Sequence, residues 1–239
     1  MRLHRFYISE PIGSKKEIIV QSEQLVNQLV RVFRLKSGDS VILFDGSGTD
    51  YESLMQDYDK QTVTFTITKS APSRFVPTRH ISLYAAVVKK DTFEWIAEKA
   101  TELGVTEIIP VMAERSEKKH LNEERLQKIV IEASEQSGRG SVPTVGSIVS
   151  LKESLEMMMQ KGIAVVVFHT EGEAFDAGTY SKQHTNLAVF IGPEGGWSPA
   201  ELEMFHSYKV PVVSLGAQVL RAETAVVAAL SLTMLGNGC

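Results

Sequence analysis

Residues 191–197 are Ile191-Gly192-Pro193-Glu194-Gly195-Gly196-Trp197, and they follow the apolar run Leu187 to Phe190, which is typical of a buried strand. Downstream, Ser198-Pro199-Ala200-Glu201 predicts the start of a helix, because serine can cap it, proline suits its first turn and Glu201 completes a capping box. The stretch therefore predicts a strand, a glycine-rich turn and a helix. Backbone groups can approach a ligand closely at such a turn, because glycine has no side chain.

Two common phosphate-binding motifs do not fit this turn. The dinucleotide fingerprint requires Gly-x-Gly-x-x-Gly, whereas residues 192–196 give Gly-x-x-Gly-Gly. A P-loop ends in Gly-Lys-Ser/Thr, whereas Trp197 and Ser198 follow the last glycine here. On this stretch alone, a tight turn without a ligand is the simpler interpretation.

A second strand–loop–helix unit changes that interpretation. Val210 to Ser214 is a short apolar strand, Leu215-Gly216 follows it, and Ala222 to Leu230 forms a helix rich in small residues. Both units place a glycine at the carboxyl end of a strand. Ligands bind at that edge of open α/β sheets, so the sequence predicts a binding crevice there.

Composition limits the class of protein. The chain has 239 residues, 43% of them hydrophobic, which is enough for two packed domains. No stretch is long enough to span a membrane, the N-terminus lacks a signal peptide, and the single cysteine, Cys239, excludes an intrachain disulfide or a cysteine metal cluster. We therefore expect a cytoplasmic protein with no membrane partner and no metal.

The net charge is −4, but residues 1–36 hold seven Lys or Arg against three Glu, which predicts one basic face.

The hydrophobic pattern changes along the chain. Up to about Ala71 it predicts short strands at Ile18–Val20, Val41–Phe44 and Thr62–Thr68, with a short helix at Leu25–Phe33. Beyond a proline-containing linker, strands alternate with helices, which predicts an α/β domain with a parallel sheet.

Several motifs in register resemble those of the SPOUT (α/β-knot) methyltransferases, and among them the ribosomal RNA small-subunit methyltransferase E family. The motifs are Gly192-Pro193-Glu194-Gly195-Gly196, Leu215-Gly216, Leu220-Arg221-Ala222-Glu223-Thr224-Ala225, His4-Arg5-Phe6-Tyr7, Glu98-Lys99-Ala100-Thr101-Glu102-Leu103-Gly104 and Glu135-Gln136-Ser137-Gly138-Arg139. The resemblance implies a PUA-like RNA-binding β-barrel over residues 1–72 and a SPOUT domain with a trefoil knot over residues 73–239. It also implies a homodimer.

The resemblance further implies that S-adenosyl-L-methionine binds where three loops converge. One loop is His169-Thr170-Glu171-Gly172, at the end of the strand Ala164–Phe168. The residues expected to contact the cofactor are His169, Thr170, Glu171, Ile191, Gly192, Pro193, Glu194, Gly195, Gly196, Ser214, Leu215, Gly216, Val219, Leu220 and Thr224.

The implied reaction is methylation of N3 of a uridine in 16S ribosomal RNA of the small ribosomal subunit. N3 carries a proton, so a base or a cation that stabilises the uracil anion is needed. Arg221 is the candidate cation, because arginine stays protonated. Glu194 and Glu223 are candidate bases of equal rank, and proton loss to water is a third possibility.

The residues expected to contact RNA are Arg2, Arg5, Arg34, Lys89, Arg115 and Arg139. Two other functions stay open. One is a noncatalytic RNA-binding or ribosome-assembly protein that keeps the SPOUT fold, and the other is a SPOUT methyltransferase with another RNA target.

Overall fold

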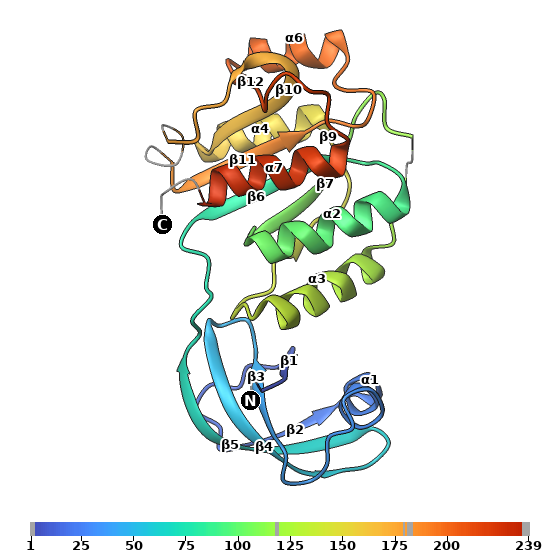
Figure 1. The fold of residues 1–239 in the computed structure, drawn as a ribbon, viewed down its shortest axis with the longest axis vertical. Helices are drawn as coiled ribbons and strands as arrows, with labels where there is room; N and C mark the ends of the chain where they lie inside the picture. Colours follow the sequence, from blue (N-terminus) through green and yellow to red (C-terminus); the bar gives the residue numbers. More distant parts are fainter. Residues whose placement is uncertain (1–2, 118–119, 179, 181–183, 236–239) are drawn as a thin grey trace. The chain divides into compact units, whose positions relative to one another are not determined.

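The computed structural model describes residues 3–117, 120–178, 180 and 184–235. Figure 1 shows the fold as a ribbon coloured from the N-terminus to the C-terminus. The chain divides into two compact units. The N-terminal unit comprises the chain up to Val76 together with Ser134–Val142, and the C-terminal unit comprises Pro77–Ala133 and the chain from Pro143 onward.

The N-terminal unit is a curved β-sheet with the strand order β1-β3-β4-β5-β2, in which only the β1–β3 pair is parallel among the described strands. Its elements are β1 (Arg5–Tyr7), β2 (Glu17–Gln21), α1 (Glu23–Asn27), the π-helical turn η1 (Gln28–Val32), β3 (Ser40–Phe44), β4 (Thr49–Tyr58) and β5 (Thr62–Pro72). The three predicted strands are confirmed. The predicted helix is divided into an α-helical and a π-helical part.

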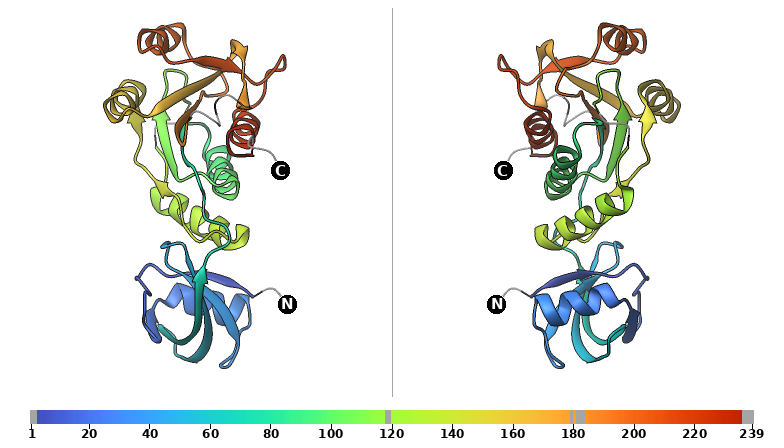
Figure 2. Two further views of the ribbon diagram at one scale, coloured as in Figure 1. Left: turned by 90° about the vertical axis from the view of Figure 1, so that its left-hand side faces the viewer. Right: turned by 90° about the vertical axis from the view of Figure 1, so that its right-hand side faces the viewer.

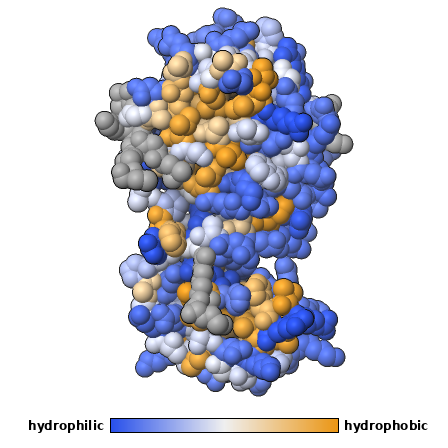
Figure 3. Space-filling view, in the orientation of Figure 1, coloured by the Kyte–Doolittle hydropathy of each residue, from blue (hydrophilic) through white to orange (hydrophobic). Residues whose placement is uncertain are grey.

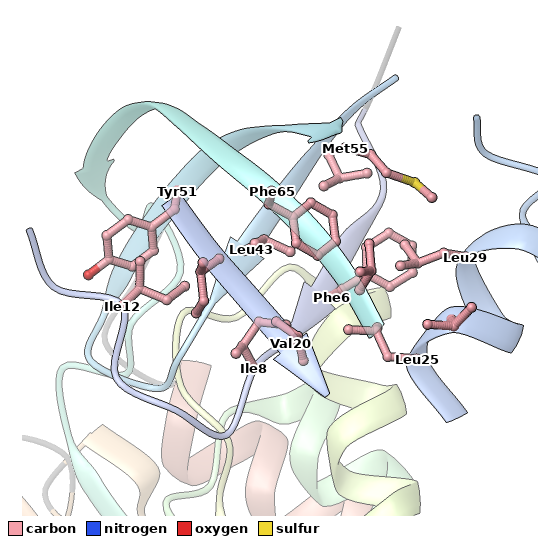
Figure 4. Packing of buried hydrophobic residues seen from close by; sticks show 14 residues of the cluster. Phe6, Ile8, Ile12, Val20, Leu25, Leu29, Leu43, Tyr51, Met55 and Phe65 are labelled. Atoms are coloured by element: carbon pink, nitrogen blue, oxygen red, sulfur yellow. The ribbon is translucent and has the colours of Figure 1, made fainter. Parts of the chain in front are cut away.

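Alternation along the strands builds the core of this unit. In β2, Ile18 and Val20 point inward and their neighbours are exposed, as a period of two requires. Figure 4 shows Phe6, Leu43 and Phe65 packed together inside the curved sheet, with Leu29 approaching from the helical turn. This apolar interior gives the N-terminal unit a core of its own.

The segment Ser134–Val142 is bonded to the same unit. The carboxylate of Glu135 accepts hydrogen bonds from the Tyr7 backbone N–H (2.9 Å) and from Nε2 of Gln28 (3.0 Å). The Gly140 N–H donates to the Phe75 carbonyl oxygen (3.1 Å). Residues far beyond the proline-containing linker in sequence therefore complete the N-terminal unit.

The C-terminal unit is a parallel sheet with the strand order β12-β10-β11-β6-β7-β8, and β9 also pairs with β7. The strands are β6 (His80–Ala86), β7 (Glu107–Met112), β8 (Thr144–Val145), β9 (Val149–Ser150), β10 (Ala164–Ala174), β11 (Asn186–Ile191) and β12 (Val212–Ser214). Every pairing among these described strands is parallel, so the predicted α/β class is confirmed. The trefoil knot stays a prediction.

Four helices cover the two faces of this sheet among the described residues: α2 (Lys90–Leu103), α4 (Leu151–Lys161), α6 (Pro199–Ser207) and α7 (Ala222–Leu235). Helix α3 (Glu123–Ser137) continues from the C-terminal unit into the segment that belongs to the N-terminal unit. Figure 2 shows α2 and α7 side by side on one face, while α4 and α6 pack on the other through Leu155 and Phe205. The predicted capping box is confirmed, because Ser198 and Glu201 exchange side-chain and backbone hydrogen bonds at the start of α6. Among the described helices, none combines the length and the apolar character needed to cross a membrane.

Candidate functional site

A cavity of about 330 Å³ lies in the C-terminal unit, at the carboxyl ends of β11 and β12 and beside the middle of β10. Its wall is formed by three chain segments and by one arginine from elsewhere. The lining residues are Arg115, Phe168, His169, Thr170, Glu171, Ile191, Gly192, Pro193, Glu194, Gly195, Gly196, Trp197, Ser214, Leu215, Gly216, Gln218, Val219, Leu220, Ala222 and Ala225. The three segments expected to converge therefore do so. Of the residues expected at the cofactor, Thr224 is the exception, because it is exposed on the first turn of α7 and outside this wall.

The first wall segment is a bulge inside β10 rather than a loop after the strand. Phe168 and Glu173 both align with Val213 of β12, so residues 169–172 leave the ladder and return to it. A β-carbon on Gly172 would lie 2.4 Å from the Val213 carbonyl carbon, so only glycine lets the bulge close against β12. The bulge turns His169, Thr170 and Glu171 to the cavity.

The second wall segment is the glycine turn. The Gly196 N–H donates to the Pro193 carbonyl oxygen (2.8 Å), and Gly196 has a φ of +68°, which glycine adopts without strain. The indole of Trp197 lies against Gly192 and forms an edge-to-face contact with Phe205 at 5.1 Å. Trp197 is 2% exposed, so a rigid aromatic floor supports the turn.

The third wall segment follows β12. The Ser214 hydroxyl donates to the Gly216 carbonyl oxygen (3.0 Å) and accepts from the Gly216 N–H (3.2 Å). This reciprocal pair braces the turn from which Leu215 and Leu220 line the cavity. The wall thus offers apolar side chains together with many backbone groups, which suits a flat, largely apolar ligand with polar edges.

Arg115 enters the wall from the turn after β7. Its Nη1 donates to the Gly195 carbonyl oxygen at 2.6 Å, although 80 residues separate the two in sequence. The RNA contact predicted for this arginine stays a prediction, and the structure places the side chain beside the glycine turn. Sequence reasoning also missed Phe168, Trp197, Gln218, Ala222 and Ala225 as wall residues, although each is within two residues of a predicted one.

The predicted catalytic residues occupy different positions. Glu194 lines the cavity, whereas Arg221 and Glu223 lie beside its wall residue Ala222 at the start of α7. Arg221 is exposed, and its guanidinium makes no hydrogen bond to the part of the chain that the structure describes. Its charge is therefore available to a substrate, and the catalytic roles stay predictions.

Two of the arginines expected to contact RNA are buried inside the N-terminal unit. Nη1 and Nη2 of Arg5 donate to the two carboxylate oxygens of Asp50 (2.6 and 2.8 Å), and Nη2 also donates to the Arg139 carbonyl oxygen (3.0 Å). Arg139 is 3% exposed, and burial lowers the pKa of its guanidinium to about 10. We correct the expected role of both to a structural one, because both side chains are buried and bonded within the unit.

The other predicted RNA contacts differ in exposure. Arg34 is exposed and has a φ of +57°, which is uncommon for a residue with a side chain. Lys89 is exposed, and its Nζ lies 3.7 Å from the Glu117 carboxylate. Arg2 lies outside the described residues. Within the described part of the chain, no three His, Cys, Asp or Glu residues are grouped so that they could hold a metal ion.

Comparison with known proteins matches both units. Residues 76–234 match a family model described as an RNA methyltransferase domain, and residues 26–68 match one described as an RNA methyltransferase PUA domain. The chain is 29% identical to ribosomal RNA small subunit methyltransferase E of Rickettsia conorii over 100% of this chain and 98% of that protein. It is 31% identical to the protein of the same name from Bacillus subtilis, over 86% and 85% of the two chains.

The fold of this chain is also similar to that of a solved structure. The crystal structure of a ribosomal RNA small subunit methyltransferase E from Neisseria gonorrhoeae, bound to S-adenosyl methionine, has a TM-score of 0.85 and 28% identity. The alignment covers 96% of each chain.

Proposed function

The chain belongs to the RNA methyltransferase family that contains ribosomal RNA small subunit methyltransferase E, and from this premise we propose that it methylates N3 of a uridine in 16S ribosomal RNA. The methyl donor is S-adenosyl-L-methionine. The observation that carries the proposal is the convergence of three glycine-containing segments on one cavity at the carboxyl edge of the parallel sheet.

The residues of the cavity fit this cofactor. Ile191, Leu215 and Leu220 provide apolar surface for the adenine ring, and the adjoining turns provide backbone donors and acceptors for its edge. The bulge at Gly172 and the packing of Gly192 on Trp197 are close approaches that a side chain would obstruct, so they fix the shape of the cradle. When bound, the cofactor supplies an activated methyl group on a sulfonium.

The protein residues then have to orient and activate the acceptor. The uracil N3 proton must leave before the nitrogen is a good nucleophile, and an adjacent guanidinium stabilises the resulting anion. The exposed Arg221, beside the cavity wall, suits that role. Glu194 lines the cavity and is the better placed of the two candidate bases, because Glu223 does not reach the wall.

The N-terminal unit is proposed to hold the ribosomal RNA. The RNA-binding domain is proposed to end at residue 72, within the compact unit that extends to Val76 and includes Ser134–Val142. Arg34 is the strongest candidate contact, since it is exposed and unlike Arg5 has no carboxylate partner among the described residues.

The protein is also proposed to act in the cytoplasm as a homodimer. Helix α7 carries few polar residues, and Leu232 on it is 40% exposed. Figure 3 shows apolar surface gathered over the C-terminal unit. A second copy would cover such a surface. A solution mass near 26.4 kDa, that of one chain, would contradict the dimer.

Two measurements test the function. Calorimetry with S-adenosylmethionine should give saturable heat, and the absence of heat would favour a noncatalytic RNA-binding protein. Mapping of methylated bases in the ribosomal and transfer RNA of a deletion strain should find one small-subunit uridine without its N3 methyl group. Loss of a methyl group at another RNA site would favour a different target.

A further inference from the structure

Arg115 is the one Lys or Arg among the residues that line the cavity. The other ionisable wall residues are His169 and the acids Glu171 and Glu194. A ligand that brings a carboxylate into this cavity would be repelled by those acids unless a cation offset them. Arg115 is the group in the wall that carries a permanent positive charge.

The turn that presents Arg115 is held in place from both ends. The Ser116 N–H donates to the Ala113 carbonyl oxygen (3.1 Å), and the Ala113 N–H donates to the Ser116 hydroxyl (3.2 Å). These two bonds close a tight turn with Arg115 inside it. The position of the arginine is therefore set before any ligand binds.

A buried carboxylate ties this turn to the helix that follows the glycine turn. Oε1 of Glu201 accepts from the Glu114 N–H (2.8 Å), and Oε2 accepts from the Ser198 N–H (2.7 Å). Glu201 is 7% exposed, so solvent competes little for either bond. One residue thus fixes the neighbour of Arg115 and the start of α6 together.

The Arg115 side chain lies along the glycine turn. Nη1 donates to the Gly195 carbonyl oxygen at 2.6 Å, and the Cδ of the same side chain lies 3.2 Å from the place that a β-carbon on Gly195 would occupy. A side chain at position 195 would therefore crowd the aliphatic part of Arg115. Among the described residues, the guanidinium of Arg115 donates one hydrogen bond, to the Gly195 carbonyl oxygen. Its other N–H groups are therefore available to donate to a ligand.

We propose that Arg115 binds the α-carboxylate of the amino-acid tail of the cofactor and so determines the specificity of the cavity for amino-acid-bearing adenosyl ligands. The inference rests on the proposed function. A guanidinium suits this role because it matches a carboxylate with two parallel hydrogen bonds. It would also align the tail, and with it the sulfonium, relative to the glycine turn.

The test compares two ligands that differ only in the tail. S-Adenosylhomocysteine carries the α-carboxylate, whereas 5′-methylthioadenosine has the same adenosyl thioether without an amino acid. Calorimetry with Arg115→Met should show an affinity for S-adenosylhomocysteine that is lower by about 10- to 100-fold. The affinity for 5′-methylthioadenosine should change by less than about 3-fold.

Two further variants complete the design. Arg115→Lys keeps the charge without the two-pronged geometry, and it should lose about half as much binding free energy as Arg115→Met. Arg125→Met is the matched control, because Arg125 is an exposed arginine of the same unit paired with Glu94, outside the cavity. It should bind both ligands as the native protein does, and all variants should first show native unfolding midpoints.

Each other outcome overturns the inference in a distinct way. Equal losses for both ligands would mean that Arg115 only supports the glycine turn. Unchanged binding of both ligands together with weaker RNA binding would mean that Arg115 contacts a phosphate. Failure of the native protein to bind either ligand would overturn the proposed function, and the inference with it.

Discussion

Gly172 of the β10 bulge approaches the backbone of Val213 so closely that a β-carbon on it would lie 2.4 Å from the Val213 carbonyl carbon. A methyl group there would push the bulge away from β12 and displace the first cavity segment. We therefore predict that Gly172→Ala lowers the free energy of unfolding by about 1–3 kcal/mol and weakens S-adenosylmethionine binding by at least about 10-fold. Urea unfolding and calorimetry measure the two effects.

Gly146→Ala is the matched control for this substitution. A β-carbon on Gly146 would lie 3.5 Å from Ile109, which is ordinary contact, and Gly146 is outside the cavity wall. It should change neither quantity appreciably. Equal effects at both positions would show that the close approach at Val213 does not control the bulge.

Trp197 provides an optical measure of cofactor binding. The chain has two tryptophans, of which Trp95 is 40% exposed on α2 and Trp197 is 2% exposed in the cavity wall. S-Adenosylmethionine should therefore change the emission of the native protein and of Trp95→Phe alike. Trp197→Phe should lose the change while calorimetry still detects binding, and its stability should fall by about 1–3 kcal/mol. A response that disappears with Trp95 would place the ligand elsewhere.

Arg34 is predicted to contact the RNA backbone. Arg34→Glu should weaken binding of a small-subunit RNA fragment by about 3- to 10-fold and flatten its salt dependence, since a phosphate contact is lost. Calorimetry with S-adenosylmethionine should be unaffected. Lys60→Glu, a charge reversal at another exposed position of the N-terminal unit, is the control. Equal weakening by both variants would indicate general electrostatic attraction rather than a contact at Arg34.

Local signals in the sequence predicted much of the fold and of the cavity wall. The capping box at Ser198 and Glu201 follows from chemistry within four residues, and the structure has it as expected. The strand–turn–helix order around Gly192 likewise places its glycines at the carboxyl edge of the sheet. Such features were predictable because each depends on its sequence neighbours.

The features that sequence reasoning missed depend on pairs far apart in the chain. Arg115 and Gly195 are separated by 80 residues, and no periodicity links them. The same holds for Arg5 and Arg139, which looked like free basic residues, whereas their side chains are buried against distant partners. A surface arginine and a buried one have the same sequence signature, since burial is decided by tertiary packing. The β10 bulge was missed because the apolar run Ala164–Phe168 predicts only the first part of the strand. The polar residues after it give no sign that pairing with β12 resumes at Glu173.

The pair of Arg5 and Asp50 supports a final prediction, which separates structure from RNA recognition. The Arg5 side chain is 7% exposed and its carboxylate partner is 21% exposed, so the ion pair is largely shielded from water. Arg5→Met would leave the carboxylate without its partner and the Arg139 carbonyl without its donor. The free energy of unfolding should fall by about 2–4 kcal/mol, and the double variant with Asp50→Leu should recover part of that loss, because no unpaired charge remains.

Arg34→Met gives the reciprocal control, since it is the same substitution at an exposed arginine of the same unit. It should change stability by less than about 0.5 kcal/mol while weakening RNA binding. Arg5→Met, studied well below its unfolding midpoint, should bind RNA with native affinity. If Arg5→Met instead kept its stability and lost RNA affinity, the guanidinium would have to leave Asp50 when RNA binds, and the structural role assigned to Arg5 would be wrong.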